Sequence, residues 1–134
     1  MTFLLAFERT HRVLMARATG VVATQDLVAL DTASIAFLAR EEKEGGPPIR
    51  GLYDFSDMTA IAVPQTRAAE RGSRSPIVRG QRVMVRSLTA ACGVVETFVQ
   101  SQRLAGNHLL AVVDSLDEAF ALLALNEPSF EDIG

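Results

Sequence analysis

The fold is decided by the stretch Leu109–Leu123, which reads LLAVVDSLDEAFALL. Its first five residues form a near-continuous apolar run, a pattern typical of a strand that is covered on both faces. Ser115 and Glu118 follow with the three-residue spacing of a capping box, which predicts the start of a helix. The apolar residues after Ser115 recur at helical spacing. A buried strand that leads directly into a helix is the building unit of an α/β protein.

The residues before this stretch show the same alternation. Apolar runs predict strands over Phe3–Arg9, Arg12–Gly20, Ile49–Phe55 and Arg82–Arg86. Apolar stripes predict helices over Thr24–Glu44, Pro64–Gly72 and Leu88–Leu104, and a last helix from Ser115 that ends before Pro128. The order β-β-α-β-α-β-α-β-α predicts a single-domain α/β protein with a mixed, mostly parallel, five-stranded sheet, an N-terminal antiparallel hairpin and about four helices. We expect the domain to span residues 1–126 and an acidic, loose tail to span 127–134.

Composition narrows the class of protein. The chain has 134 residues, the size of one domain, and 49% of them are hydrophobic, which is typical of a globular chain. The net charge of −3 argues against a nucleic-acid binder. The single cysteine, Cys92, forms no disulfide within the chain, and neither a signal-peptide pattern nor a membrane-length apolar run is present. We therefore expect a cytoplasmic protein without a transmembrane segment.

Known catalytic and cofactor motifs are absent from the sequence. His11 and His108 have no second ligand at metal-binding spacing, and no glycine-rich nucleotide loop or Gly-x-Ser-x-Gly motif occurs. The sequence thus predicts no metal and no cofactor.

Polar residues follow the predicted strand that ends at Phe55. Asp54, Ser56, Asp57 and Thr59 supply carboxylates and hydroxyls at the carboxyl end of a strand, where open α/β sheets usually bind ligands. A strand-to-helix loop, in which Asp and Ser bond to nearby backbone groups, explains the same residues. Both interpretations stay open from the sequence alone.

The strongest charge asymmetry lies between residues 67 and 86. Six arginines and one acidic residue, Glu70, give this segment a net charge of +5; the arginines are Arg67, Arg71, Arg74, Arg79, Arg82 and Arg86. Arg67 and Arg71 on the predicted second helix are candidates for binding an acidic protein, a phosphate or a lipid headgroup. The alternative is a solvated surface that pairs with the chain's own acids, such as Glu41, Glu42 and Glu44. The absence of aromatic residues between Met58 and Val94 argues against nucleic acid.

Four stretches resemble the STAS-like superfamily, whose founding members are bacterial anti-sigma-factor antagonists: residues 18–27, 51–58, 81–85 and 113–123. The chain is most similar to a branch of small bacterial STAS-like proteins. The resemblance implies a non-catalytic regulatory or protein-interaction module. One departure matters, because Ala62 and Val63 stand where phosphorylatable antagonists carry an Asp-Ser pair. Without a hydroxyl at Val63, the phosphoserine switch of those antagonists is not expected here.

Two functions follow from these observations. In the first, a partner protein docks on Asp54–Arg71, and the arginines supply electrostatic complementarity. In the second, the chain carries a lipid or a small apolar metabolite, because STAS-like folds resemble lipid-transfer domains of the CRAL-TRIO type and the mean hydropathy of +0.21 is high. An enzyme that uses Asp54 or Asp57 as a base ranks last, since neither has a partner at recognisable spacing. The apolar hairpin residues Phe3, Leu5 and Phe7 also predict a homodimer interface.

Overall fold

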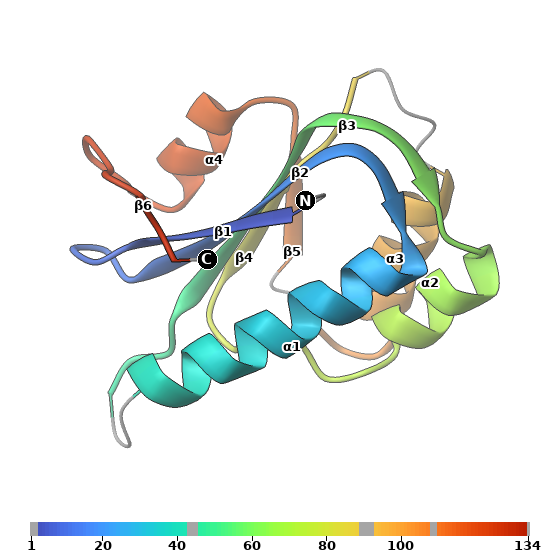
Figure 1. Cartoon of the computed structure of the whole chain (residues 1–134), viewed down its shortest axis with the longest axis horizontal. Coiled ribbons are helices and arrows are strands. Elements are labelled where there is room, and N and C mark those ends of the chain that lie inside the picture. The colour runs from blue at the N-terminus through green and yellow to red at the C-terminus, as the bar shows by residue number, and fades with distance from the viewer. Residues whose placement is uncertain (1–2, 43–45, 89–92, 108–109, 134) are drawn as a thin grey trace.

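The computed structural model describes residues 3–42, 46–88, 93–107 and 110–133, and it confirms the predicted α/β class and the N-terminal hairpin (Figure 1). The elements are β1 (Phe3–Glu8), β2 (Val13–Ala23), α1 (Thr24–Glu41), β3 (Arg50–Ala62), α2 (Gln65–Gly72), β4 (Arg82–Val85), α3 (Gly93–Leu104), β5 (Leu110–Val113), α4 (Leu116–Leu122) and β6 (Glu131–Asp132). Cys92, His108 and Leu109, and residues 89–91 at the expected start of the third helix, lie outside the described residues.

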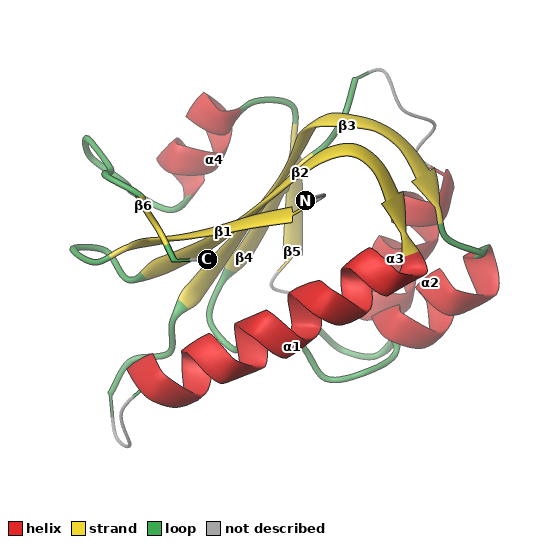
Figure 2. Ribbon diagram, viewed as in Figure 1, coloured by secondary structure: helices red, strands yellow, loops and turns green. Residues whose placement is uncertain are grey.

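The sheet has six strands in the order β5-β4-β3-β2-β1-β6, one more than predicted. β2, β3, β4 and β5 are parallel to one another, whereas β1 is antiparallel to β2 and to β6. Figure 2 shows α1, α2 and α3 on one side of the sheet and α4 on the other. The central strands are therefore covered on both faces, as the apolar runs predict.

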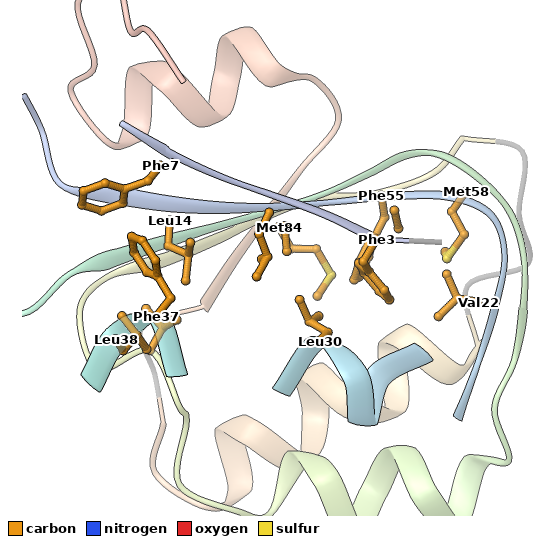
Figure 3. Close-up of a cluster of buried hydrophobic side chains, with 14 of the residues drawn as sticks. Phe3, Phe7, Leu14, Val22, Leu30, Phe37, Leu38, Phe55, Met58 and Met84 are labelled. Atoms are coloured by element: carbon orange, nitrogen blue, oxygen red, sulfur yellow. The ribbon is translucent and has the colours of Figure 1, made fainter. Parts of the chain in front are cut away.

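Each face of the sheet has its own hydrophobic core. The larger core lies between the sheet and α1, where Phe7 and Phe37 meet edge to face with ring centroids 4.9 Å apart and Leu30 lies near Met84 (Figure 3). The smaller core joins Leu52 and Val83 to Leu123 after α4. Because side chains alternate across a strand, Leu52 faces α4 and Tyr53 faces α1.

β2 and β3 are longer than the sequence predicts. We expected β2 to end at Gly20 and β3 to end at Phe55, but the two strands stay paired to Ala23 and Ala62. Gly20 adopts a positive φ of 69° beside a register shift, so it bends the pair instead of ending it. Figure 1 shows the two strands curving together toward α2 and α3. Ser56, Asp57 and Thr59 are exposed on this extension, while Met58 is buried.

The tail is not loose. Residues 131 and 132 pair with Phe7 and Ala6 of β1 as β6, and the backbone amide of Ile133 donates a hydrogen bond to Leu5. Phe130 stacks on Phe120 of α4 with ring centroids 6.2 Å apart. We expected a loose tail because its charged residues are acidic. Two apolar residues of the tail, Phe130 and Ile133, instead hold it against α4 and β1.

The helix ends agree in part with the predicted caps. The Oγ of Ser115 accepts a hydrogen bond from the Glu118 amide at 3.2 Å, which confirms the predicted start of α4. α1 begins after Ala23, one residue before the predicted cap Thr24, and the Asp26 carboxylate accepts a hydrogen bond from the Ala23 amide at 2.8 Å. α1 ends at Glu41, before the predicted Glu44.

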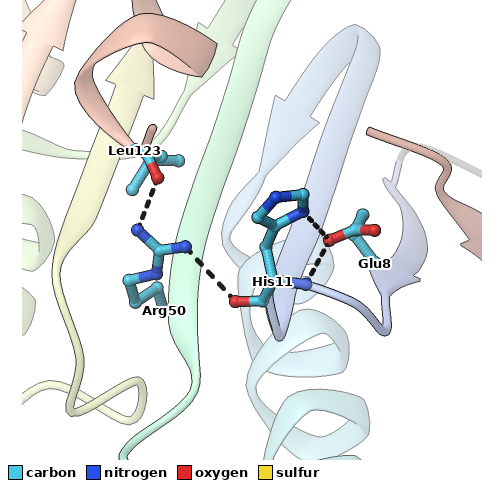
Figure 4. A network of polar contacts seen from close by, with 4 residues as sticks. All are labelled: Glu8, His11, Arg50 and Leu123. Atoms are coloured by element: carbon cyan, nitrogen blue, oxygen red, sulfur yellow. Dashed lines mark hydrogen bonds and ion pairs between the residues drawn. The ribbon is translucent and has the colours of Figure 1, made fainter. Parts of the chain in front are cut away.

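A polar network joins the hairpin, β3 and α4 (Figure 4). Arg50 donates hydrogen bonds to the carbonyl of Leu123 at 2.6 Å and to that of His11 at 3.2 Å. The buried Glu8 carboxylate accepts from the His11 amide at 2.6 Å and lies 2.7 Å from its Nδ1. Burial alone would raise the pKa of Glu8, but the His11 hydrogen bonds and charge outweigh it and hold this pKa below its ordinary value.

The apolar residues of the hairpin are covered within one chain. Phe3, Leu5 and Phe7 are buried in the larger core. Part of the outer edge of β1 is paired with β6. A second copy is therefore not needed to cover these three side chains, and the homodimer stays a prediction.

Candidate functional site

Three of the predicted site residues meet on the extension of β3. The Oδ1 of Asp54, a fully buried side chain, accepts hydrogen bonds from the Ser56 amide at 3.1 Å and from its Oγ at 2.6 Å. Arg17 of β2 lies between the two carboxylates, with Nη2 2.5 Å from Asp57 and Nε 3.7 Å from Asp54. The hydrogen bond to Asp57 raises the pKa of Arg17. Each charge in this cluster has an opposite charge beside it.

Arg17 was missed by the sequence reasoning because it lies 37 and 40 residues before these carboxylates. The parallel pairing of β2 with β3 places Arg17 directly opposite Asp54. We call these four residues, Arg17, Asp54, Ser56 and Asp57, the Arg17 cluster. Arg17 bridges both carboxylates, which leaves the cluster with a net charge of −1 and makes it a structural feature of the β2–β3 pair.

Two other predicted residues stay apart from the cluster. Thr59 is exposed on β3, and Arg67 is exposed on α2, where its guanidinium lies 3.9 Å from Glu70. An ion pair of this length between exposed side chains contributes little to stability. The structure thus does not bring the six predicted residues into one site.

Arg71, the last of the six predicted site residues, lies on α2 and contacts α1. Its guanidinium binds the Asp31 carboxylate of α1 through two hydrogen bonds, one of them 2.5 Å long. This bidentate pair connects α2 to α1. Arg71 also lines two neighbouring spaces under the helices.

The larger space has a volume of about 360 Å³, and we call it the Arg82 pocket. Residues of α1, β3, α2, β4, α3 and the segment 74–78 line it. Among the described residues its polar lining includes Asp31, Ser34, Tyr53, Arg71, Arg74, Ser75, Arg82 and Gln102. This volume lies in the range of small-molecule sites.

Arg82 is the unusual member of this lining. Its side chain is only 2% exposed, and its Nε and Nη2 have no hydrogen-bond acceptor among the residues the structure describes. Burial lowers the pKa of Arg82, although a guanidinium keeps its charge in proteins. A buried charge without partners costs several kcal/mol, which sets Arg82 apart from the other arginines of the lining, since Arg71 and Arg74 each lie beside a carboxylate.

The local sequence makes room for Arg82. Gly51 lies opposite it in the β3–β4 register, and a Cβ at Gly51 would stand 3.0 Å from Val78 and 3.5 Å from the Arg82 Cγ. A Cβ at position 51 would therefore press on Val78, while it would only touch the Arg82 stem. The signal that could have found this site was an arginine that opens a short, buried parallel strand, opposite a glycine.

Tyr53 and Gln102 complete the polar wall. Burial raises the pKa of the Tyr53 phenol. The positive charges of Arg82 and Arg71 lower this pKa and the negative charge of Asp31 raises it, but burial is the largest cause. Tyr53 is therefore neutral and offers a hydroxyl group to the pocket. Gln102 donates from Nε2 to the Gly72 carbonyl at 2.5 Å and to the Arg74 carbonyl at 3.4 Å. Its buried Oε1 has no donor among the described residues. Gln102 thus ties α3 to the end of α2 and to the segment that encloses the pocket.

Comparison with known proteins adds no family assignment: no protein-family model and no curated protein matches the chain. Among the described residues, no helix is both long and apolar enough to cross a membrane. In the same part of the chain, no three His, Cys, Asp or Glu side chains are grouped so that they could hold a metal ion.

Proposed function

We propose that the protein is a non-catalytic binding module whose Arg82 pocket takes a small molecule with one carboxylate. The single observation that carries this proposal is the buried guanidinium of Arg82 with no acceptor on Nε and Nη2. These two nitrogens form one edge of the guanidinium, which matches the two oxygens of a carboxylate. A bound acid would satisfy both donors and neutralise the buried charge.

The charges around the pocket favour a monoanion. Arg71 is paired with Asp31, and Arg74 lies 3.0 Å from Glu70. No carboxylate among the described residues lies within ion-pair distance of Arg82. One positive charge is therefore unmatched, which favours a carboxylate over a phosphate dianion.

Binding requires a small movement of Arg82. Nε and Nη2 are shielded from solvent, although the Arg82 side chain lines the pocket. The guanidinium must turn toward the pocket to meet an acid, and the gain of a charge-assisted, bidentate contact supplies the driving force. Sensing or carriage of a ligand suits this pocket better than catalysis, since its described lining pairs no nucleophile with a histidine base.

The predicted docking of a partner protein on Asp54–Arg71 receives less support. In that segment both carboxylates of the Arg17 cluster are paired with Arg17, and Arg71 is paired with Asp31, which leaves Arg67 and Thr59 as exposed candidates. The STAS-like resemblance and the homodimer stay predictions beside the ligand-binding proposal.

Calorimetric titration with hexanoate tests the proposed function, with hexylamine as the control of opposite charge. We expect hexanoate to bind and hexylamine not to bind. Arg82→Met should weaken hexanoate binding at least tenfold, because the charged contact is lost while the side-chain volume is nearly kept. Arg79→Met, which removes an exposed arginine three residues away, should bind like the wild type. Equal hexanoate affinity in the two variants would contradict the proposal.

A further inference from the structure

An apolar cavity adjoins the Arg82 pocket. It has a volume of about 80 Å³ and is lined on its own side by Leu27, Phe55, Val63, Ala68, Val94 and Val95. The apolar cavity and the Arg82 pocket are neighbours, because four side chains line both of them: Leu30, Tyr53, Arg71 and Phe98.

The two spaces differ in chemistry. The Arg82 pocket contains the unmatched guanidinium, whereas the apolar cavity has only one charged side chain in its described lining, Arg71, and Asp31 already neutralises it. A single ligand that fills both spaces must have an acidic end and an apolar end. Val63, which lacks the hydroxyl of a phosphoserine switch, is buried and forms part of the apolar wall.

We propose that the ligand of the Arg82 pocket carries an apolar chain that enters the apolar cavity between α1, α2 and α3, and therefore belongs to the short- and medium-chain fatty acids. This inference rests on the proposed carboxylate site. The cavity is several times larger than the roughly 10–15 Å³ that one water needs, and apolar cavities stay dry unless a ligand fills them. It holds several carbon atoms but is too small for the long chains of membrane lipids.

The test is a chain-length series measured by calorimetry: propionate, butyrate, hexanoate, octanoate and dodecanoate. Burial of each added methylene should tighten binding about fourfold until the cavity is full. We expect affinity to rise from propionate and to stop rising before dodecanoate.

Two variants block the cavity without touching Arg82. Leu27→Phe on α1 and Val94→Phe on α3 each add volume at a half-buried lining position, from two different elements. In each folded variant, hexanoate should bind no more tightly than propionate, while propionate binds as in the wild type. Val28→Phe is the matched control, because Val28 neighbours Leu27 but is 58% exposed and is not part of the lining. Circular dichroism shows which variants are folded. If one of the two blocking variants, Leu27→Phe or Val94→Phe, does not fold, the other still tests the cavity.

The outcomes separate the two proposals. A chain-length dependence that both blocking variants abolish supports the fatty-acid assignment. Equal affinity for all five acids, still lost in Arg82→Met, overturns the chain inference and leaves the carboxylate site standing. If no acid binds, or if binding is unchanged in Arg82→Met, the carboxylate site and the fatty-acid assignment both fail.

Discussion

Asp54 and Arg82 lie on adjacent parallel strands and face opposite sides of the sheet, and they show two treatments of a buried charge. The Oδ1 of Asp54 accepts two hydrogen bonds from Ser56, and its Oδ2, which accepts no hydrogen bond among the described residues, forms an ion pair with Arg17 at 3.7 Å. Arg82 has no acceptor for two of its nitrogens among the described residues. The difference is one of charge pairing: Asp54 has an opposite charge beside it, whereas no carboxylate among the described residues pairs with Arg82. A buried charge without an opposite charge reduces stability and is more easily explained by a ligand.

The largest expected effect on stability comes from removing the charge of Asp54, which is paired with Arg17. Asp54→Asn keeps the volume but weakens the acceptor of both Ser56 donors and removes a charge beside Arg17, so we expect a loss of about 2–3 kcal/mol in the free energy of unfolding. Urea denaturation measures this loss. Asp57→Asn is the control, since Asp57 is half exposed, and it should cost less than about 1 kcal/mol. Equal losses in the two variants would show that burial of Asp54 does not matter.

Glu8 extends the comparison to a third buried charge, and its effect depends on pH. Its pKa is lower in the folded chain than in the unfolded chain, so its contribution is present above the unfolded pKa and is lost as the pH falls through the folded pKa. Glu8→Gln should cost about 1.5 kcal/mol at pH 7, the scale of a hydrogen bond to a charged group.

The measurement is urea denaturation of Glu8→Gln and the wild type at pH 7 and at pH 3. The difference between them should shrink at pH 3, because this pH lies below the unfolded pKa of Glu8 and the unfolded chain then takes up a proton more readily than the folded chain does. A difference that is as large at pH 3 as at pH 7 would assign the cost to packing and not to charge.

The smallest expected effect on the free energy of unfolding is a gain in stability, unlike the losses expected for the Asp54 and Glu8 variants. Arg82→Met removes an unmatched buried charge and should raise the stability of the ligand-free protein by about 1 kcal/mol. Arg79→Met, at an exposed position, should stay within about 0.5 kcal/mol of the wild type. Thermal unfolding of both variants without ligand makes the measurement. A clear loss of stability in Arg82→Met would mean that this arginine has structural partners and would weaken the ligand proposal.

The local sequence patterns predicted the α/β class, the hairpin and the order of the first nine elements. Ser115 caps α4 as expected, because capping depends on neighbouring residues alone. The extension of β3 through Ser56 and Asp57 was not predicted, since its hydrogen bonds depend on the partner strand β2. β6 was missed for the same reason, because its partner β1 lies at the other end of the described chain.

The candidate site was predicted only in part. Arg71 was named for its charge, but its partner Asp31 lies 40 residues away in sequence. Arg82 was noticed only as one of six arginines, because the sequence does not show which of them the fold leaves without a partner. Local composition locates charge, whereas the tertiary structure decides which charges are neutralised.

The pairing of β6 with β1 has a consequence for biosynthesis. During translation, β1 and β2 leave the ribosome early and can form their hairpin, but residues 131–132 emerge much later. Until then the outer edge of β1 presents unpaired backbone groups, which are a template for pairing with another chain. The nascent protein therefore has a period of aggregation risk that ends when Phe130 and Ile133 dock and cover that edge.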